Sequence, residues 1–242
     1  MLSEKAKRFK KDVYVLNSLF KSMGIYKNIP IVLMNERNLR KLHQELTKSN
    51  DGVVQYAAAQ YMYRGHYMGA IVVRERAIKH DLLQIMFHEI SHDLLQFIKW
   101  HDMALMRNIL KVAVKNKNFE IEMLTRIHQS GYEAESGGDS EKMMKLILEE
   151  TLTDVCSYYY IQKANALSLC NEEIPEDYAS VLKDVSSLID SFIVLYKEKD
   201  ERPTTGITER VMKYAVSGIK YVGDKPVIPV SKGAQTIMNR WM

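Results

Sequence analysis

The sequence predicts an α+β protein, with a small N-terminal part that holds a few-stranded sheet and a mostly helical C-terminal part. Two observations carry this prediction. Short apolar runs bounded by turn residues, which are typical of strands, lie early in the 242-residue chain. Long segments with apolar residues at helical spacing occupy most of the remainder. We expect residues 1–102 and residues 103–242 to form two subdomains of a single domain.

The N-terminal part is expected to contain two helices and three short strands. Apolar residues recur at helical spacing over residues 3–23, and Gly24 is placed to end that helix. A second helix is expected over residues 36–48. Apolar runs rich in β-forming residues predict strands over residues 29–34, 53–63 and 68–74.

A long apolar helix should follow and begin near Leu82, because Asp81 and Gln84 form a variant of the capping box. Farther along, the polar stretch of residues 131–140 predicts a loop, and Ser140 can cap the helix that follows it. The spacing of apolar residues predicts further helices over residues 103–115, 118–129, 175–199 and 208–221.

An HExxH pattern, His88-Glu89-Ile90-Ser91-His92, lies within the long apolar helix. Residues four apart share one face of a helix, so the two imidazoles can bind one metal ion. Zinc in a hydrolytic site takes three protein ligands and leaves one position for water, whose pKa it lowers to about 7. Glu89 is offset by one residue and can serve as the base for that water. Two ordinary histidines are the alternative, which the intervening glutamate and the apolar surroundings disfavour.

These motifs resemble those of a known enzyme family. His88-Glu89-x-x-His92 resembles the active-site helix of the zincin metallopeptidases, and Glu150-x-x-x-Asp154 resembles the second helix of their gluzincin branch. The resemblance implies a zincin-like fold and a Zn²⁺ ion bound by His88, His92 and Glu150. It also implies that Glu89 is the general base and proton shuttle and that Asp154 hydrogen-bonds His88. His92 and Glu150 are 58 positions apart in the sequence, which is farther than in thermolysin, a familiar member of the branch.

The acidic pair supports a metal site on physical grounds as well. Glu150 and Asp154 are one turn apart on a helix with a wide apolar surface, where carboxylates are costly unless they are paired or metal-bound. A ligating histidine usually donates its second N–H to a carboxylate or carbonyl. Glu149 is the competing third ligand, but only Glu150 has an acidic residue one turn later. A solvated helix with two acids remains the alternative.

The resemblance also suggests how a substrate is held. Zincins have an edge strand beside the active-site helix that can pair with an extended peptide, and residues 69–74 resemble it; an interior strand without such a role is the alternative. Gluzincin-like peptidases commonly use a tyrosine or histidine to stabilise the oxyanion. Tyr158 is a candidate, although it can equally be a packing residue. Other candidates are His128, Tyr132 and Tyr214.

Three functional hypotheses follow. The first is a zinc-dependent endopeptidase that acts on a protein or peptide substrate. The second is a zincin-like binding or regulatory protein without catalytic activity. The third is a basic adaptor for nucleic acid or membrane, since the net charge is +4 and the first predicted helix is basic. A solvated face is favoured there, because no recognition motif accompanies Lys5, Lys7, Arg8, Lys10 and Lys11.

The expected location is the cytoplasm. No apolar run is long enough for a transmembrane helix, and the N-terminus lacks the apolar segment of a secretory signal. Cys156 and Cys170 would be about 21 Å apart along a straight helix, too far for a disulfide, and free thiols fit a reducing compartment. Export by a signal-independent route stays open.

Overall fold

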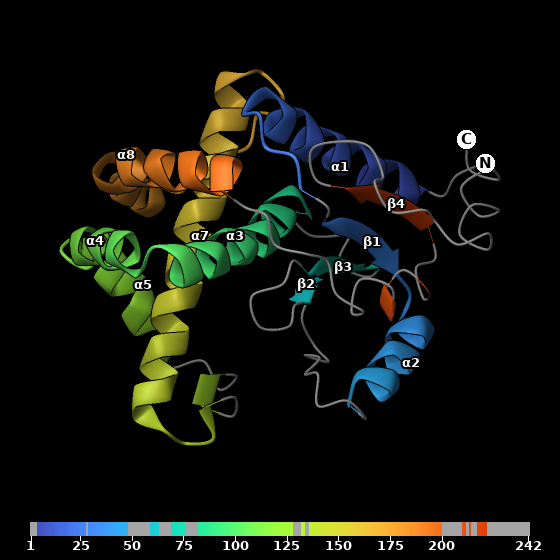
Figure 1. The fold of residues 1–242 in the computed structure, drawn as a ribbon, viewed down its shortest axis with the longest axis horizontal. Coiled ribbons are helices and arrows are strands. Elements are labelled where there is room, and N and C mark those ends of the chain that lie inside the picture. The colour runs from blue at the N-terminus through green and yellow to red at the C-terminus, as the bar shows by residue number, and fades with distance from the viewer. Residues whose placement is uncertain are drawn as a thin grey trace. The chain divides into compact units, whose positions relative to one another are not determined.

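The computed structural model consists of helices and one small sheet, so the chain is α+β in the broad sense (Figure 1). It forms two compact units, one of Met1–Asp93 with Lys199–Met242 and the other of Leu94–Glu198. Helix α3 (Leu82–His101) contributes residues to both units. The structure describes residues 4–27, 29–47, 59–62, 69–75, 82–127, 132–133, 136–199, 210–211, 213 and 217–221.

The sheet belongs to the first unit. Its described strands follow the order β2-β3-β1-β4, in which β1 runs parallel to β3 while β2 and β4 pair antiparallel at the two edges. The parallel register places Ile31 opposite Ile71 and Leu33 opposite Val73. The strands are β1 (Pro30–Met34), β2 (Ala59–Met62), β3 (Ala70–Arg74) and β4 (Ser217–Tyr221).

The expectation that residues 69–74 form an edge strand was wrong. Strand β3 pairs with β2 on one side and with β1 on the other, so it is an interior strand. Every residue of β1 and β3 is buried, and a continuous apolar run of this kind is typical of a strand covered on both faces. The alternation expected of a half-exposed strand is missing from both segments.

Helices α1 (Glu4–Ser22) and α2 (Glu36–Thr47) lie on opposite sides of the sheet (Figure 1). Helix α1 ends as expected at Gly24, which has a φ of 69° and allows the Ile25 N–H to reach the Phe20 carbonyl at 2.8 Å. The apolar stripe of α2 joins one face of the sheet in a buried cluster of Val32, Met34, Leu39, Leu42, Leu46, Ala70, Val72 and Val211.

The C-terminal part of the first unit differs from the expectation. Of the helix expected over residues 208–221, the described residues 210, 211 and 213 are helical, but its end was wrong, because Ser217–Tyr221 forms β4 and pairs with β1, with Ile31 opposite Lys220. A strand that completes a sheet edge gains its stability from backbone pairing with its neighbour, which local helical spacing does not register. The expected cap at Asp81 lies outside the described residues.

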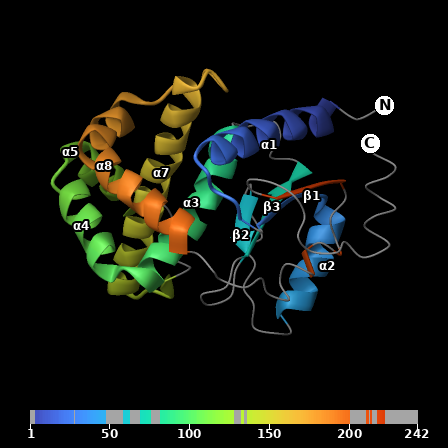
Figure 2. The ribbon, with the colours of Figure 1, turned by 45° about the horizontal axis from the view of Figure 1, so that its top comes forward.

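The second unit is helical. After α3 come α4 (Met103–Ala113), α5 (Lys117–Ile127), α7 (Ser140–Ala166) and α8 (Glu176–Lys199), which Figure 2 shows grouped together. Asp102 starts α4 by accepting a hydrogen bond from the Leu105 N–H at 2.9 Å. Asn165, near the end of α7, accepts from the Glu172 N–H at 3.1 Å and donates to the Glu172 carbonyl at 2.7 Å, so one side chain closes the connection to α8.

The N-cap of α7 is Asp139, one residue before the expected Ser140, and its side chain accepts from the Lys142 N–H at 3.0 Å. Asp139→Ala is expected to lower the free energy of unfolding by about 1 kcal/mol, because that N–H then loses its partner. Ser140→Ala is the matched control and should leave stability nearly unchanged. Urea unfolding followed by circular dichroism measures both variants, and equal effects would contradict this assignment of the cap.

Neither cysteine forms a disulfide, as expected. Cys156 is fully buried in α7, and burial raises the pKa of its thiol to about 12. A thiol with this pKa stays protonated at physiological pH, so Cys156 is not suited to nucleophilic attack. Cys170 is half-buried and donates to Asn165 Oδ1 at 3.1 Å.

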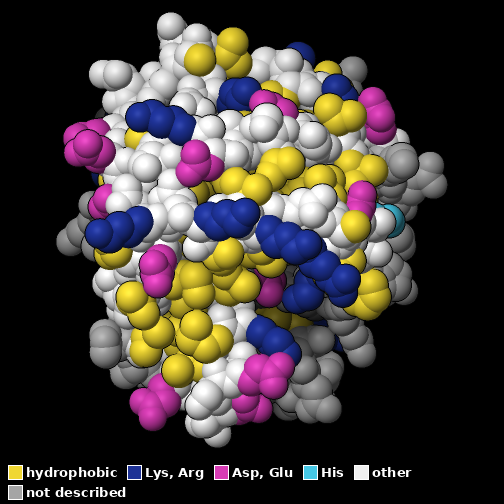
Figure 3. Space-filling model, turned by 90° about the vertical axis from the view of Figure 1, so that its left-hand side faces the viewer, with side chains coloured by type: hydrophobic (Ala, Val, Ile, Leu, Met, Phe, Trp, Pro, Cys, Tyr) yellow, Lys and Arg dark blue, Asp and Glu magenta, His cyan; other side chains and the backbone are white. Residues whose placement is uncertain are grey.

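The surface of the second unit carries both apolar and basic side chains. Figure 3 shows a row of Lys and Arg side chains that divides two groups of hydrophobic ones. The exposed apolar residues of this unit include Val114, Ile121, Leu124 and Met144. None of the described helices is both long and apolar enough to span a bilayer.

Candidate metal centre

The HExxH motif lies in the middle of α3, as expected. The helix forms around fully buried apolar residues, among them Phe87, Ile90 and Leu94. Ser91 is also fully buried, and it satisfies its hydroxyl by donating to the Phe87 carbonyl at 2.7 Å. The Ser91 hydroxyl is therefore satisfied within α3 itself. His88 and His92 lie on a less buried side of the helix.

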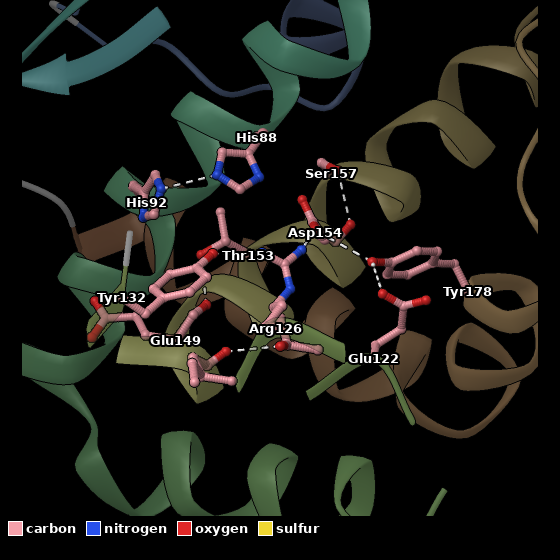
Figure 4. A network of polar contacts seen from close by, with 12 residues as sticks. His88, His92, Glu122, Arg126, Tyr132, Glu149, Thr153, Asp154, Ser157 and Tyr178 are labelled. Atoms are coloured by element: carbon pink, nitrogen blue, oxygen red, sulfur yellow. Dashed lines mark hydrogen bonds and ion pairs between the residues drawn. The ribbon is translucent and has the colours of Figure 1, made fainter. Parts of the chain in front are cut away.

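His88 and His92 aim the same ring nitrogen at one point. Their Nε2 atoms are 3.2 Å apart, the rings are nearly perpendicular at 82°, and both side chains are half-buried (Figure 4). Tetrahedral zinc with bonds of about 2.0–2.1 Å places two ligand nitrogens about 3.3 Å apart. A hydrogen bond between neutral imidazoles gives a similar distance but needs one donor and one acceptor Nε2. The pair as it stands thus fits two zinc ligands.

Glu150 completes the group. Ligand atoms of His88, His92 and Glu150 all lie within 4.8 Å of one another, and this group could hold a metal ion. Two imidazoles and one carboxylate are the donor set typical of a hydrolytic zinc site. Glu149 is placed differently, since its Oε2 lies 3.3 Å from Lys99 Nζ in an ion pair. Of the two glutamates that the sequence left open, Glu150 is the one found with the histidines.

Glu89 follows His88 directly and is buried, with 8% of its surface exposed. Burial shields a carboxylate from bulk water, which is a common property of catalytic acids and bases. Its role as general base is a prediction from the motif.

Asp154 lies one turn after Glu150 on α7 and is held by a network of polar groups within the second unit (Figure 4). Its Oδ2 forms an ion pair with Arg126 Nη2 and accepts from the Tyr178 hydroxyl at 3.3 Å. The same Tyr178 hydroxyl lies 3.2 Å from Glu122 Oε2. The expectation that Asp154 orients His88 stays a prediction.

Sequence reasoning did not find Arg126, Glu122 or Tyr178. The argument that buried carboxylates must be paired or metal-bound applies to both acids of α7, and Asp154 is paired through Arg126. The signal for a cationic partner was therefore present, but nothing in the sequence identified which of the many lysines and arginines supplies it. Arg126 comes from α5, which packs against α7 in the fold.

Burial and neighbouring charges together shift the pKa values of Arg126, Tyr132 and Tyr178. Burial alone would lower the pKa of Arg126, but Asp154 and then Tyr132 raise it by more, so the guanidinium stays charged. Burial raises the pKa of Tyr132, Arg126 opposes this, and Glu150 and Asp154 raise it further. Burial, followed by Asp154 and Glu122, also raises the pKa of Tyr178. Both phenols are therefore neutral at physiological pH.

The candidates for oxyanion stabilisation are placed unequally. Tyr158 packs its ring against Tyr178, with ring centroids 4.4 Å apart. Tyr132 accepts a hydrogen bond from Arg126 Nη1 at 2.8 Å, and the charge of Glu150 is one of the causes that raise its pKa. His128 and Tyr214 lie outside the described residues. Any role of Tyr132 or Tyr158 in catalysis stays a prediction.

Comparison with known proteins gives no relative. The chain matches no protein-family model, no curated protein and no solved structure.

Proposed function

We propose that this protein is a zinc-dependent metalloendopeptidase with a zincin-like catalytic centre. The observation that carries the proposal is the convergence of ligand atoms from His88, His92 and Glu150 within 4.8 Å, in residues that also form an HExxH pattern. Zinc fits this donor set better than calcium or magnesium, which prefer oxygen ligands. Neither cysteine belongs to this group of residues.

A zinc ion bound by these residues would polarise a peptide carbonyl and lower the pKa of a water molecule. His88, His92 and Glu150 would hold the ion and leave one position open for water or substrate. Glu89 would take the proton of the attacking water and deliver it to the leaving amine. Asp154, fixed by Arg126, would receive the second N–H of His88 and so set the tautomer of that ligand.

The way in which a substrate would be held has to differ from the initial expectation. Both sides of β3 are occupied by other strands, so β3 has no backbone groups left to pair with a peptide. Of the described strands, the edges are β2 and β4. An extended substrate that adds a strand to this sheet would therefore pair with one of these two.

The metal content of the purified full-length chain tests this proposal. We expect about one zinc ion per chain and less than about a tenth of that in His92→Ala, because removal of a ligand leaves an incomplete site. His101→Ala is the matched control, since His101 is on the same helix but stacks on Phe97. Elemental analysis by mass spectrometry gives the content, and cleavage of an unfolded protein substrate gives the activity.

The outcomes separate the hypotheses. Zinc that is lost in His92→Ala together with cleavage that a chelator stops would support a peptidase. Zinc without cleavage of any of a broad set of substrates would favour an inactive zincin-like binding protein. Absence of stoichiometric zinc from the wild-type chain, or equal zinc in His92→Ala, would overturn the proposal.

A further inference from the structure

Arg126 occupies an unusual position in the second unit. One guanidinium makes contacts in two directions, from Nη1 to the Tyr132 hydroxyl at 2.8 Å and from Nη2 to Asp154 Oδ2. Its Nε is buried and finds no hydrogen-bond partner among the described residues. A buried donor without a partner costs free energy, so this placement is maintained against a local penalty.

Three acidic residues are associated with Arg126 in the second unit. Glu150 and Asp154 are four residues apart on α7, and Glu122 is joined to Asp154 through the shared Tyr178 hydroxyl. Arg126 is the cation that is ion-paired within this group. Because Arg126 and Tyr178 both engage Oδ2, the carboxylate of Asp154 is restrained from rotating.

We propose that Arg126 is a positioning residue for the metal centre, which fixes Asp154 one turn after Glu150 on α7 and thereby raises the affinity of the site for zinc. This inference rests on the proposed function. Groups that hold metal ligands without touching the ion typically alter metal affinity by about 10- to 100-fold. Arg126 would act on the metal ligands indirectly, through Asp154. Its planar guanidinium can hold Asp154 with one nitrogen and Tyr132 with the other at the same time.

A purely electrostatic role would have the opposite sign. A cation close to a zinc site repels the ion, so removal of the charge alone would tighten zinc binding. Positioning requires the geometry of the guanidinium, whereas repulsion requires only its charge. Lysine retains the charge, but its single ammonium group on a flexible stem does not reproduce the fork that holds Tyr132 and Asp154 together.

The test measures zinc affinity of the full-length chain by competition with a chelating dye, for wild type, Arg126→Lys and Arg126→Met. We expect both variants to bind zinc about 10- to 100-fold more weakly. Glu120→Gln is the matched control, because Glu120 lies on the same helix and is exposed; its affinity should stay within about threefold of wild type, as expected for a surface substitution away from the site. Thermal unfolding in the presence of a chelator shows whether each metal-free variant folds.

Arg126→Met leaves Asp154 without its ion pair and can lose stability, so Arg126→Lys, which keeps a cation there, carries the test if the methionine variant does not fold. Wild-type affinity in Arg126→Lys, or tighter binding in Arg126→Met, would overturn the inference while the proposed function stands. A wild-type chain that binds no zinc would overturn both. The two failures are therefore distinguishable in one set of titrations.

Discussion

Replacing Glu89 by glutamine is expected to leave zinc content unchanged and to lower peptide hydrolysis by about 10²- to 10⁴-fold, the range that general acid–base catalysis contributes. Glutamine has nearly the same shape and fits the same buried position, but it cannot take a proton from water. Because Glu89 follows His88 in the chain and is not part of the group that could hold a metal ion, metal binding and catalysis should separate in this variant.

The measurement pairs elemental analysis with the initial rate of cleavage of an unfolded protein substrate. Glu120→Gln is a suitable control, because Glu120 is an exposed acid in the first turn of α5 and should have no effect on either quantity. Undiminished cleavage by Glu89→Gln would remove the general base from the mechanism. Loss of zinc in the same variant would instead show that Glu89 helps to bind the metal.

The second large effect is expected from two neighbouring glutamates. Glu150→Gln should weaken zinc binding by more than about 100-fold, since the loss of a ligand exceeds the loss of a group that only supports one. Glu149→Gln removes just the surface ion pair with Lys99, a contact worth at most about 1 kcal/mol, and should bind zinc as the wild type does.

A competition titration with a zinc-chelating dye compares the two variants on the same day and with the same metal stock. The pair is informative because the substitutions are chemically identical and only one position apart in the chain. If Glu149→Gln were the weaker binder, the third ligand would have been assigned to the wrong residue. If neither variant changed affinity, the third ligand would have to come from elsewhere.

Patterns within short stretches of sequence predicted individual helices, but they did not predict which strands pair with one another. Helical spacing and Gly24 correctly predicted α1, and the apolar surroundings of the HExxH motif correctly predicted α3. Strand β4 was missed because its partner β1 lies almost two hundred residues away. The interior position of β3 was likewise invisible, since strand order depends on which segments meet and not on the composition of one segment.

The same distinction applies to the candidate site. The spacing of His88 and His92 implied convergence, because a helix brings residues four apart to one face, and the distance between their Nε2 atoms agrees. The contribution of Glu150 required a resemblance to be suggested and coordinates to be observed. The pairing of Arg126 with Asp154 required the packing of α5 on α7, which no local rule predicts.

If the protein is an endopeptidase, as we propose, its own chain is a possible substrate, and the hydrogen bonds of the Asn165 side chain become relevant to this risk. Proteolytic enzymes act on backbone that can be drawn out into their cleft, and the connection between α7 and α8 would otherwise be an accessible stretch of this kind. The Asn165 side chain forms hydrogen bonds with both the N–H and the carbonyl of Glu172, and these bonds hold that stretch at the end of α7. Under the proposed function, these two hydrogen bonds are expected to make the connection between α7 and α8 more resistant to self-cleavage.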